Sequence, residues 1–365
     1  MKEGKKFIIA GGGTGGHIFP AIAIANAIKK LSPSSSFLFV GAKGKMEMEK
    51  IPLAGFEIKG LSISGFNRSS LIKNIGLPYK IAKSFFQVAD ITAKYKPDAV
   101  IGVGGYSTFP MLRYAQYKGI PTFIHEANSY AGKSNIMLAK KADLIFTATD
   151  KMESFFPKSK IRITGNPVRD EIINWRIDKK EAIEFFGLNA SKKVVLVIGG
   201  SLGARSINES ISNSLELFEQ NDLQLIWQTG KIYFEQAEEK SKGKQNVFVT
   251  DFINKMNYAY AAADIVISRS GAMSISELCI VKKPVVFVPF PFAAEDHQKA
   301  NAQKLVDQNA ALMVEDKNAI KELAPKVIAL SKEVAMQKKM VDNIEKLIVK
   351  NADIVIAQQI LEYLN

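Results

Sequence analysis

The sequence predicts an α/β fold of two Rossmann-like halves, each a doubly wound parallel sheet. Short apolar runs alternate with helical patterns, and this alternation occurs twice, interrupted by a polar, charged stretch between Gly165-Asn166-Pro167 and Lys193. Strands and helices in alternation are typical of parallel sheets that helices cover. Because open α/β sheets bind ligands beyond the carboxyl ends of their strands, we expect a ligand site in a cleft between the two halves.

The expected strands follow the apolar runs in chain order. They are Phe7–Ala10, Phe37–Val40, Ala99–Val103, Thr122–His125 and Leu144–Thr147 in the first half, and Val194–Ile198, Leu225–Gln228, Val247–Val249, Ile265–Ser268 and Val285–Val288 in the second. From Ala319 on the pattern is helical throughout. We expect a first domain over residues 1–167, a second over 168–349, and a last helix over 350–365 that packs back on the first.

The composition is that of a soluble globular protein, with 47% hydrophobic and 23% charged residues in a chain of 365. No apolar stretch approaches the roughly 20 residues that cross a bilayer, and the N-terminus runs directly into a strand, so we expect a cytoplasmic chain without a cleaved signal. The formal net charge of +13 predicts an acidic partner, which could be nucleic acid, anionic lipid or a phosphorylated substrate. No basic-aromatic module of a nucleic-acid-binding type is visible, which disfavours nucleic acid.

Three glycine-rich loops follow expected strands, at Gly11–His17, Gly102–Ser107 and Gly199–Ala204. The first precedes a helical pattern over 21–31 and matches the dinucleotide motif GxGxxG. An NAD-binding site also needs an acidic residue at the end of the second strand, and no acid precedes Glu47 there, which disfavours hydride transfer. Glycine lets a backbone approach a pyrophosphate closely, so the three loops together favour phosphate binding over tight packing alone.

The stretch Ser268–Asn301 combines several polar groups around one strand and one helix. The expected strand stops at the turn Arg269-Ser270-Gly271, which opens directly into a helical pattern. Unpaired N–H groups and the helix dipole make such a helix start suited to a phosphate. Glu277 could then reach a sugar hydroxyl, and Glu295–Gln298 with Asn301 offers further donors and acceptors. The alternative is an ordinary α/β unit with a polar helix start.

All three histidines, His17, His125 and His297, lie at these strand ends or loops, and each could be structural or catalytic. The spacings HExxH, paired cysteines and DxD are absent, so we expect no metal and no other cofactor. DxD is the acidic metal clamp of one large class of sugar-nucleotide transferases. Without it, a transferase would have to neutralise a leaving diphosphate with helix dipoles and arginine.

The region Ser69–Lys96 interleaves apolar residues with lysines, and Pro78 begins or kinks its helix. An apolar face flanked by lysines can enter the headgroup layer of an anionic membrane. The alternative, favoured by composition alone, is a core helix with solvated lysines.

Together these stretches resemble the MurG family of cell-wall glycosyltransferases. The matching segments are GGGTGGHIFPAIAIA, GVGGYSTFP, HEANSYAGKSN, TGNPVR, GGSLGARSIN, VTDFI, SRSGAMSISEL and EDHQKANA, in family order over nearly the whole chain. The resemblance implies a two-domain GT-B fold, with the acceptor and membrane side in the first half and the sugar nucleotide in the second. It also implies an inverting transfer of N-acetylglucosamine from UDP-N-acetylglucosamine to the 4-hydroxyl of lipid I. The place implied is the cytoplasmic face of the membrane, peripherally bound through Ser69–Lys96.

The resemblance assigns the donor residues by position. Ser201 and Arg169 would meet the diphosphate, the backbone of Ile253 the uracil, and Glu277 the ribose. The sugar hydroxyls would face His297, Gln298 and Asn301, with Asn208 nearby. The helix starts add further donor contacts, at Thr14, Gly15 and Gly16 and at Ser270, Gly271 and Ala272.

On the acceptor side the resemblance implies Gly104, Gly105, Tyr106 and Asn128, with His17 as the first choice of general base and Glu126 as the second. The family usually has glutamine where this chain has Ala127. Two other functions remain open at this point: a sugar-nucleotide epimerase of the same fold, and a membrane-attached nucleotide-binding protein without turnover. Product analysis with UDP-N-acetylglucosamine alone separates the transferase from the epimerase.

Overall fold

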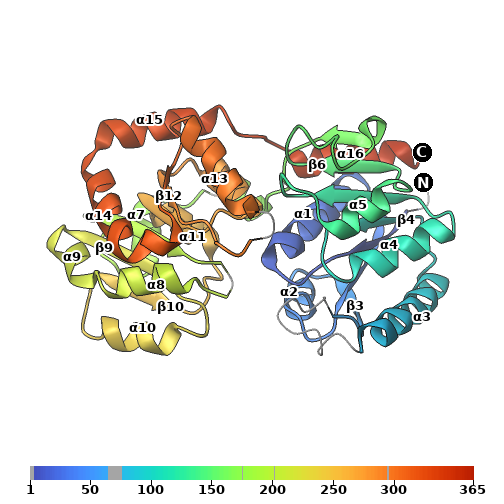
Figure 1. Ribbon diagram of the computed structural model, residues 1–365, viewed down its shortest axis with the longest axis horizontal. Coiled ribbons are helices and arrows are strands. Elements are labelled where there is room, and N and C mark those ends of the chain that lie inside the picture. The colour runs from blue at the N-terminus through green and yellow to red at the C-terminus, as the bar shows by residue number, and fades with distance from the viewer. Residues whose placement is uncertain (1–3, 65–75, 175, 201, 294–295) are drawn as a thin grey trace. The chain divides into compact units, whose positions relative to one another are not determined.

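The computed structural model describes residues 4–64, 76–174, 176–200, 202–293 and 296–365. The chain forms two compact units (Figure 1). Unit 1 consists of Met1–Arg169 with Val349–Asn365, and unit 2 of Asp170–Ile348. Each unit is an α/β structure with its own parallel sheet, which confirms the predicted fold class.

In the described part of unit 1, the sheet has seven strands in the order β3-β2-β1-β4-β5-β6-β7. Its strands are β1 Lys6–Ala10, β2 Ser36–Ala42, β3 Glu57–Leu61, β4 Ala99–Gly102, β5 Thr122–Glu126, β6 Leu144–Thr147 and β7 Ile161–Ile163. Its helices are α1 Gly15–Leu31, α2 Glu47–Leu53, α3 Leu77–Tyr95, α4 Thr108–Tyr117, α5 Lys133–Ala139 and α16 Ala352–Tyr363, with a 3-10 turn η2 over Lys158–Lys160. The five strands expected here are present, whereas the edge strands β3 and β7 were not predicted.

Alternate residues of β1 show how this sheet is covered on both faces. Phe7 and Ile9 belong to one buried cluster, with side chains of α1 and α16. Ile8 and Ala10 belong to a second cluster, with side chains of α3 and α4. A strand buried on both faces needs apolar residues without interruption, so the run of β1 follows from its central place.

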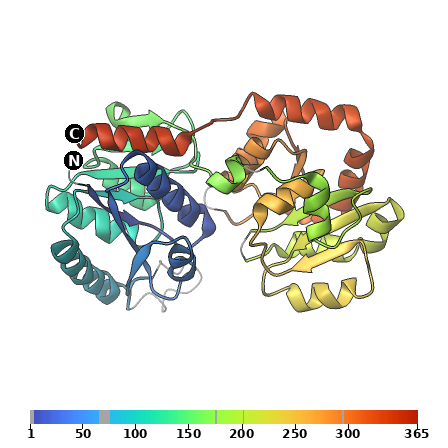
Figure 2. The same ribbon diagram turned by 180° about the vertical axis from the view of Figure 1, so that it is seen from behind.

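The last helix, α16, packs against α1 although more than 300 residues separate them in the chain (Figure 2). Ile356, Ala357 and Ile360 are buried in the cluster that contains Phe7 and Ile9. The Tyr363 hydroxyl donates a hydrogen bond of 2.5 Å to Asp143. The two ends of the chain therefore build one core.

Among the residues of unit 2 that the structure describes, six strands form a sheet in the order β10-β9-β8-β11-β12-β13. Its strands are β8 Lys193–Ile198, β9 Leu223–Gln228, β10 Val247–Thr250, β11 Ile265–Ser268, β12 Val285–Phe287 and β13 Leu312–Met313. Its helices are α6 Asp170–Ile173, α7 Lys179–Phe185, α8 Arg205–Ser212, α9 Leu215–Gln220, α10 Phe234–Ser241, α11 Met256–Ala262, α12 Ala272–Val281, α13 His297–Asp307, α14 Ala319–Lys332 and α15 Val334–Glu345, with a 3-10 turn η4 over Asp316–Asn318. One buried cluster joins alternate residues of β8, β9 and β11 to α8 and α14.

In both sheets the strand order reverses beside the first strand of the unit. In unit 1 the chain moves from β1 outward to β2 and β3, then returns to β4 on the other side of β1. In unit 2, β8 and β11 are neighbours in the same way. Loops that leave adjacent strands in opposite directions open a crevice at the carboxyl edge of a sheet, and ligands of open α/β sheets bind there.

We expect Ile360→Ala to lower the free energy of unfolding of unit 1 by about 3 kcal/mol, because it leaves a cavity in a fully buried contact. Urea unfolding followed by circular dichroism measures the change. Leu53→Ala is the control within unit 1, since that side chain is 75% exposed and should change stability by less than about 0.5 kcal/mol. Equal effects of the two substitutions would contradict the packing role of α16.

Candidate active site

The glycine-rich loops lie at the strand-order reversals of the two sheets. The first and second loops follow β1 and β4, which are neighbours in unit 1. The third loop and the turn Arg269-Ser270-Gly271 follow β8 and β11, which are neighbours in unit 2. Each unit therefore presents one candidate ligand site, formed by two loops that are distant in sequence.

His17 lies in the first turn of α1, because this helix begins at Gly15 and not at Ala21 as expected from the sequence. Its Nδ1 is 2.9 Å from the carbonyl oxygen of Gly12. A carbonyl oxygen only accepts, so Nδ1 carries the proton and Nε2 of the neutral ring keeps its lone pair. The geometry thus orients His17 with Nε2 as a proton acceptor.

Gly104 and Gly105 bring the second loop against His17 and the first loop. A Cβ at Gly104 would lie 2.7 Å from His17 Nε2, and a Cβ at Gly105 would lie 2.5 Å from the Gly12 carbonyl oxygen. Either contact is too close for a real side chain, so both positions need glycine. Tyr106, next in the loop, is exposed and available to a ligand.

Glu126, the last residue of β5, has both carboxylate oxygens occupied. Oε1 accepts from the backbone and side-chain amides of Asn128 at 3.1 and 3.2 Å. Oε2 accepts from the Gly132 N–H and from Asn135 Nδ2, both at 2.9 Å. These four hydrogen bonds stabilise the loop over 127–132. They also occupy the carboxylate of Glu126, which is therefore poorly placed to act as the base. Of the two bases expected from the sequence, the geometry favours His17.

His125 is a buried histidine beside this site. Desolvation, with a smaller contribution from the nearby His17, lowers the pKa of its imidazole to about 4, against weaker opposite effects of Asn166 and Gly165. Its ring is therefore neutral at neutral pH, so it adds no positive charge behind His17.

Thr14, Gly15 and Gly16 form the start of α1, where a negative charge would be stabilised. No acidic side chain lies in the first turn, and the Thr14 side chain does not cap the helix. The guanidinium carbon of Arg169 lies 4.3 Å from the ring centre of Phe19, one turn further along the helix. The structure thus brings Arg169 to the first glycine loop within unit 1.

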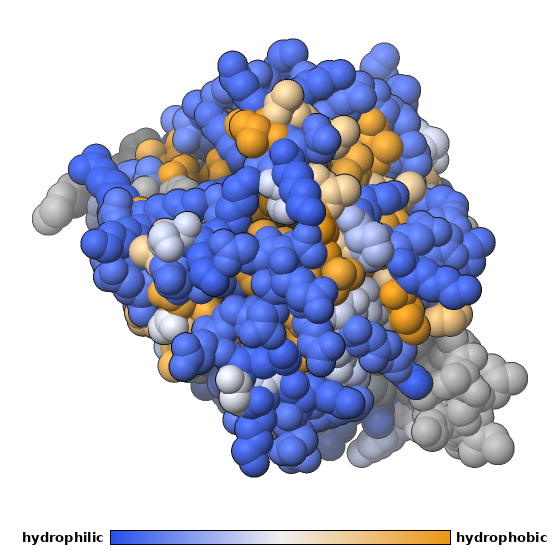
Figure 3. Space-filling model, turned by 90° about the vertical axis from the view of Figure 1, so that its left-hand side faces the viewer, coloured by the Kyte–Doolittle hydropathy of each residue, from blue (hydrophilic) through white to orange (hydrophobic). Residues whose placement is uncertain are grey.

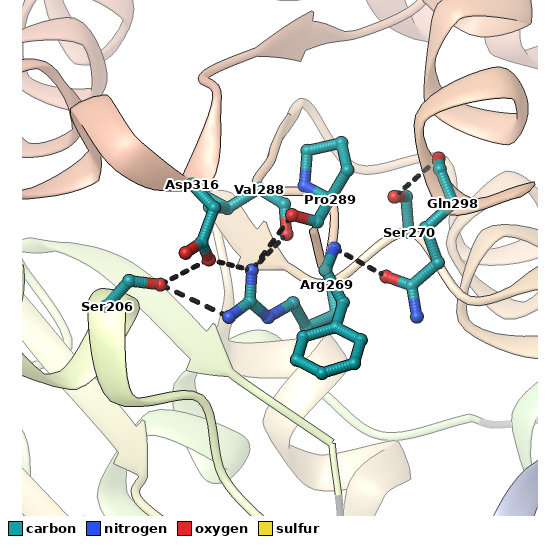
Figure 4. Close-up of polar contacts among 8 residues, drawn as sticks. Ser206, Arg269, Ser270, Val288, Pro289, Gln298 and Asp316 are labelled. Atoms are coloured by element: carbon teal, nitrogen blue, oxygen red, sulfur yellow. Dashed lines mark hydrogen bonds and ion pairs between the residues drawn. The ribbon is translucent and has the colours of Figure 1, made fainter. Parts of the chain in front are cut away.

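In unit 2 the start of α12 gathers several of the expected donor residues (Figure 4). The Ser270 hydroxyl donates to the backbone oxygen of Gln298 at 2.8 Å, and Asn301 Nδ2 lies 3.5 Å from the Ser270 carbonyl oxygen. Gln298 Oε1 accepts from the Phe290 N–H at 3.0 Å. Ser270, Gly271 and Ala272 therefore face the first turn of α13, which His297 opens.

Glu277 is buried on α12, and one of its carboxylate oxygens accepts from the Tyr260 hydroxyl at 3.0 Å. This bond fixes the direction of the carboxylate, as ribose recognition would require. Ser201, expected at the diphosphate, lies outside the described residues.

Asn208 and Ile253 make internal contacts that the sequence did not indicate. The buried Asn208 donates to the Thr229 carbonyl at 2.8 Å and accepts from Trp227 Nε1 at 3.0 Å, so its amide stabilises unit 2 itself. The Ile253 N–H donates to Gln228 Oε1 at 3.0 Å. A uracil that used this N–H would have to displace that side chain.

Arg269 is the main residue of this site that the sequence analysis did not single out. Its NH1 donates to the carbonyl oxygens of Val288 and Pro289 at 2.9 and 3.1 Å, and to Asp316 at 2.5 Å (Figure 4). Its NH2 donates to Ser206 at 3.1 Å. One buried guanidinium thus ties the strand end of β11 to α8, η4 and the loop after β12. The sequence did contain a sign of this role, because an arginine that directly follows an apolar strand and precedes a Ser-Gly turn is expected to be buried and paired.

Within the part of the chain that the structure describes, no three His, Cys, Asp or Glu side chains come together as metal ligands. Glu126, Glu277 and Arg269 are instead paired with backbone amides, carbonyl oxygens or side chains, as described above.

The similarity to known proteins agrees with this geometry. The N-terminal domain of glycosyltransferase family 28 matches residues 7–147, and the C-terminal domain of the same family matches residues 194–359. The two parallel-sheet units and these matches define the class as family 28 glycosyltransferases.

Two relatives extend the match to the whole chain. Both are named UDP-N-acetylglucosamine--N-acetylmuramyl-(pentapeptide) pyrophosphoryl-undecaprenol N-acetylglucosamine transferase. The protein of Phocaeicola vulgatus is 48% identical and covers 99% of this chain and 97% of its own length. That of Christiangramia forsetii is 47% identical, with 100% and 99% covered. The chain belongs to the MurG family.

Solved structures support the same fold. MurG of Acinetobacter baumannii matches with a TM-score of 0.74 at 28% identity, covering 98% of this chain and 99% of its own. A UDP-GlcNAc 2-epimerase from Neisseria meningitidis matches with a TM-score of 0.70 at 18% identity, covering 98% and 100%. The second likeness shows a shared fold alone.

We expect Arg269→Met to lower the free energy of unfolding of unit 2 by about 3 kcal/mol, because it leaves Asp316 and two carbonyl oxygens without their buried donor. Arg205→Met is the matched control: its ion pair with Glu209 is exposed on the arginine side and should contribute under about 0.5 kcal/mol. Urea unfolding of the three proteins compares them. A small, equal loss in both variants would show that Arg269 does not organise the site.

Proposed function

We propose that the chain transfers N-acetylglucosamine from UDP-N-acetylglucosamine to the 4-hydroxyl of undecaprenyl-diphospho-N-acetylmuramyl-pentapeptide, converting lipid I to lipid II in peptidoglycan synthesis. The observation that carries this proposal is the 47 to 48% identity, over the whole chain, to relatives named for that transfer. The family 28 matches in both halves support a glycosyl transfer in place of the epimerase or the non-enzymatic alternative.

His17 is the general base of the proposed reaction. The acceptor 4-hydroxyl oxygen attacks the anomeric carbon, its proton passes to His17 Nε2, and the bond from the anomeric carbon to the diphosphate oxygen breaks with its electron pair on UDP. Attack opposite the leaving group inverts the anomeric configuration. The 2.9 Å contact of Nδ1 with the Gly12 carbonyl supports this role, because it keeps the lone pair on Nε2. Gly104, Gly105, Tyr106 and Asn128 form the acceptor side.

The donor site lies at the start of α12 and the third glycine loop. Helix N–H groups at Ser270-Gly271-Ala272 stabilise the negative charge that develops on UDP, without a metal ion. The resemblance also assigns Ser201 and Arg169 to the diphosphate. Glu277 accepts from the ribose hydroxyls, and the carboxylate direction set by Tyr260 supports that contact. His297, Gln298 and Asn301 meet the sugar, and the backbone of Ile253 meets the uracil. Asn208 acts behind them by stabilising the loop after β9.

The chain also binds peripherally to the cytoplasmic face of the membrane, through helices α3 and α4. Two aromatic side chains there, Phe86 and Tyr117, are 79% and 80% exposed. Tyr117 also lines a groove of about 450 Å³, together with Phe85, Arg113, Tyr114 and Lys141. Exposed aromatic rings and cations in one place suit an interface with anionic lipid.

The face turned to the viewer in Figure 3, on the side of α9 and α14, is mostly hydrophilic. Among the described helices, none is both long and apolar enough to cross a bilayer. Residues 69–75 of the expected membrane region lie outside the described residues.

The test of the transferase uses purified protein with UDP-N-acetylglucosamine and a short-chain lipid I analogue, in the presence of a chelator. We expect UDP release that depends on the acceptor, and a product heavier by one N-acetylhexosamine. Release without acceptor, or a changed sugar in the recovered nucleotide, would overturn the transferase in favour of the epimerase.

We expect His17→Ala to lower kcat by about 100-fold, since the reaction loses its proton acceptor, while the affinity for UDP stays within about twofold because His17 does not bind the nucleotide. Steady-state kinetics and calorimetric UDP binding measure the two quantities. Turnover close to that of the unchanged protein would exclude His17 as the base.

We expect replacing both Phe86 and Tyr117 by serine to weaken binding to vesicles of phosphatidylglycerol and phosphatidylcholine by about 10-fold, because two apolar anchors are lost. Co-sedimentation measures it, and turnover on a water-soluble acceptor should not change. Leu53→Ser, which removes a similarly exposed apolar side chain from α2, is the control. Unchanged vesicle binding of the double variant would place the membrane contact elsewhere.

A further inference from the structure

Glu47 is a buried carboxylate that the proposed mechanism does not use. It is the first residue of α2 and only 1% exposed. Its Oε2 accepts from the Gly13 N–H at 2.7 Å, and its Oε1 accepts from the Ala42 N–H at 2.9 Å. One side chain thus joins the first glycine loop to the carboxyl end of β2.

The backbone around Glu47 leaves no room for a side chain at Gly12 or Gly41 beside this carboxylate. A Cβ at Gly12 would lie 2.2 Å from Glu47 Cδ, and a Cβ at Gly41 would lie 2.5 Å from Glu47 Cγ. Two glycines therefore serve the placement of one carboxylate. The Gly13 N–H is also turned toward Glu47, so it is not available to a phosphate.

The segment that Glu47 holds is the one that orients His17. Gly12 precedes Gly13, and its carbonyl oxygen accepts from His17 Nδ1 at 2.9 Å. The Gly12 N–H donates to the Gly104 carbonyl at 3.2 Å, and Gly104 in turn lies against the His17 ring. A displacement of the Gly12-Gly13 peptide would move the acceptor that fixes the imidazole tautomer.

We propose that Glu47 is a positioning residue for His17: its carboxylate fixes the first glycine loop so that the Gly12 carbonyl keeps the proton on Nδ1 and the lone pair on Nε2. The catalytic consequence rests on the function proposed above, whereas the effect on the His17 tautomer does not. A carboxylate is required because both partners are N–H donors; the amide of glutamine would place an NH₂ group against one of them.

The test compares Glu47→Gln with the unchanged chain by two measurements. Nitrogen NMR of protein labelled with ¹⁵N at its three histidines reports which ring nitrogen carries the proton, and single His→Gln variants assign the signals. Kinetics with donor and acceptor give kcat and the donor KM. We expect the unchanged chain to show the Nδ1–H tautomer of His17, and Glu47→Gln to show a mixture of tautomers. We also expect kcat to fall about 10- to 100-fold with the donor KM within about twofold.

Two further variants complete the test. Glu49→Gln makes the same chemical change on the same helix, at a side chain that is 71% exposed, and should leave both measurements unchanged. Gly41→Ala pushes Glu47 without removing its charge, and we expect it to shift the His17 tautomer in the same direction. If Glu47→Gln gives no folded protein by circular dichroism, Gly41→Ala decides the matter with the same two measurements.

The outcomes separate this proposal from the proposed function. His17 signals of the folded variants that match those of the unchanged chain would overturn the positioning role, even if kcat fell. A tautomer shift in Glu47→Gln, with no acceptor-dependent transfer by the unchanged chain, would support the positioning role and reject the transferase.

Discussion

The close approach of two backbones at the strand-order reversal of unit 1 is the contact on which the proposed acceptor site depends. β1 and β4 lie side by side, and the loops that leave them touch at Gly12 and Gly105 with no room for a side chain. This contact places the Gly12 carbonyl under His17 and the second loop beside the ring. Because the loops diverge from adjacent parallel strands, their geometry is set by the sheet, which is rigid and buried, and not by the loops alone.

In unit 2 the loops at the strand-order reversal are held by a charged side chain. The end of β11 carries Arg269, whose guanidinium bonds to two carbonyl oxygens, one carboxylate and one hydroxyl from three other elements. Gln228, at the end of β9, donates to the Gly200 carbonyl and accepts from the Ile253 N–H, so it connects two further loops. Buried polar groups that are fully paired make a rigid edge, which suits the proposed donor site, since it would hold a flexible nucleotide sugar in one orientation.

The sequence was sufficient for those parts of the fold that depend on local pattern. Central strands such as β1 are uninterrupted apolar runs because helices cover both faces. The edge strand β3 was missed because Glu57 and Lys59 interrupt the pattern, and β13 because it has two residues. The glycine loops were found because glycine is rare enough in such positions to be informative.

The partners of the site residues could not be found in this way. From the sequence alone, Glu47 was noted only as an acid too late in the chain to bind a ribose. In the structure it accepts from the first glycine loop, which follows the neighbouring strand β1. The pairing of Arg269 with Asp316 depends likewise on which strands are neighbours. The pairing of Glu126 with Gly132 and Asn135 depends on where α5 begins. Strand order is a property of the whole chain, so the sequence named the residues of the site and left most of their hydrogen bonds open.

The docking of α16 on α1 has a consequence for the order in which the protein matures during synthesis. Unit 2 is contiguous in sequence, so it can complete its core as soon as the residues up to Ile348 have left the ribosome. Unit 1 contains the first strand of the chain but also its last helix, and Ile356, Ala357 and Ile360 fill its core. The half that is translated first is therefore the last to close, and until α16 has been synthesised its apolar face beside α1 is open to the factors that attend nascent proteins.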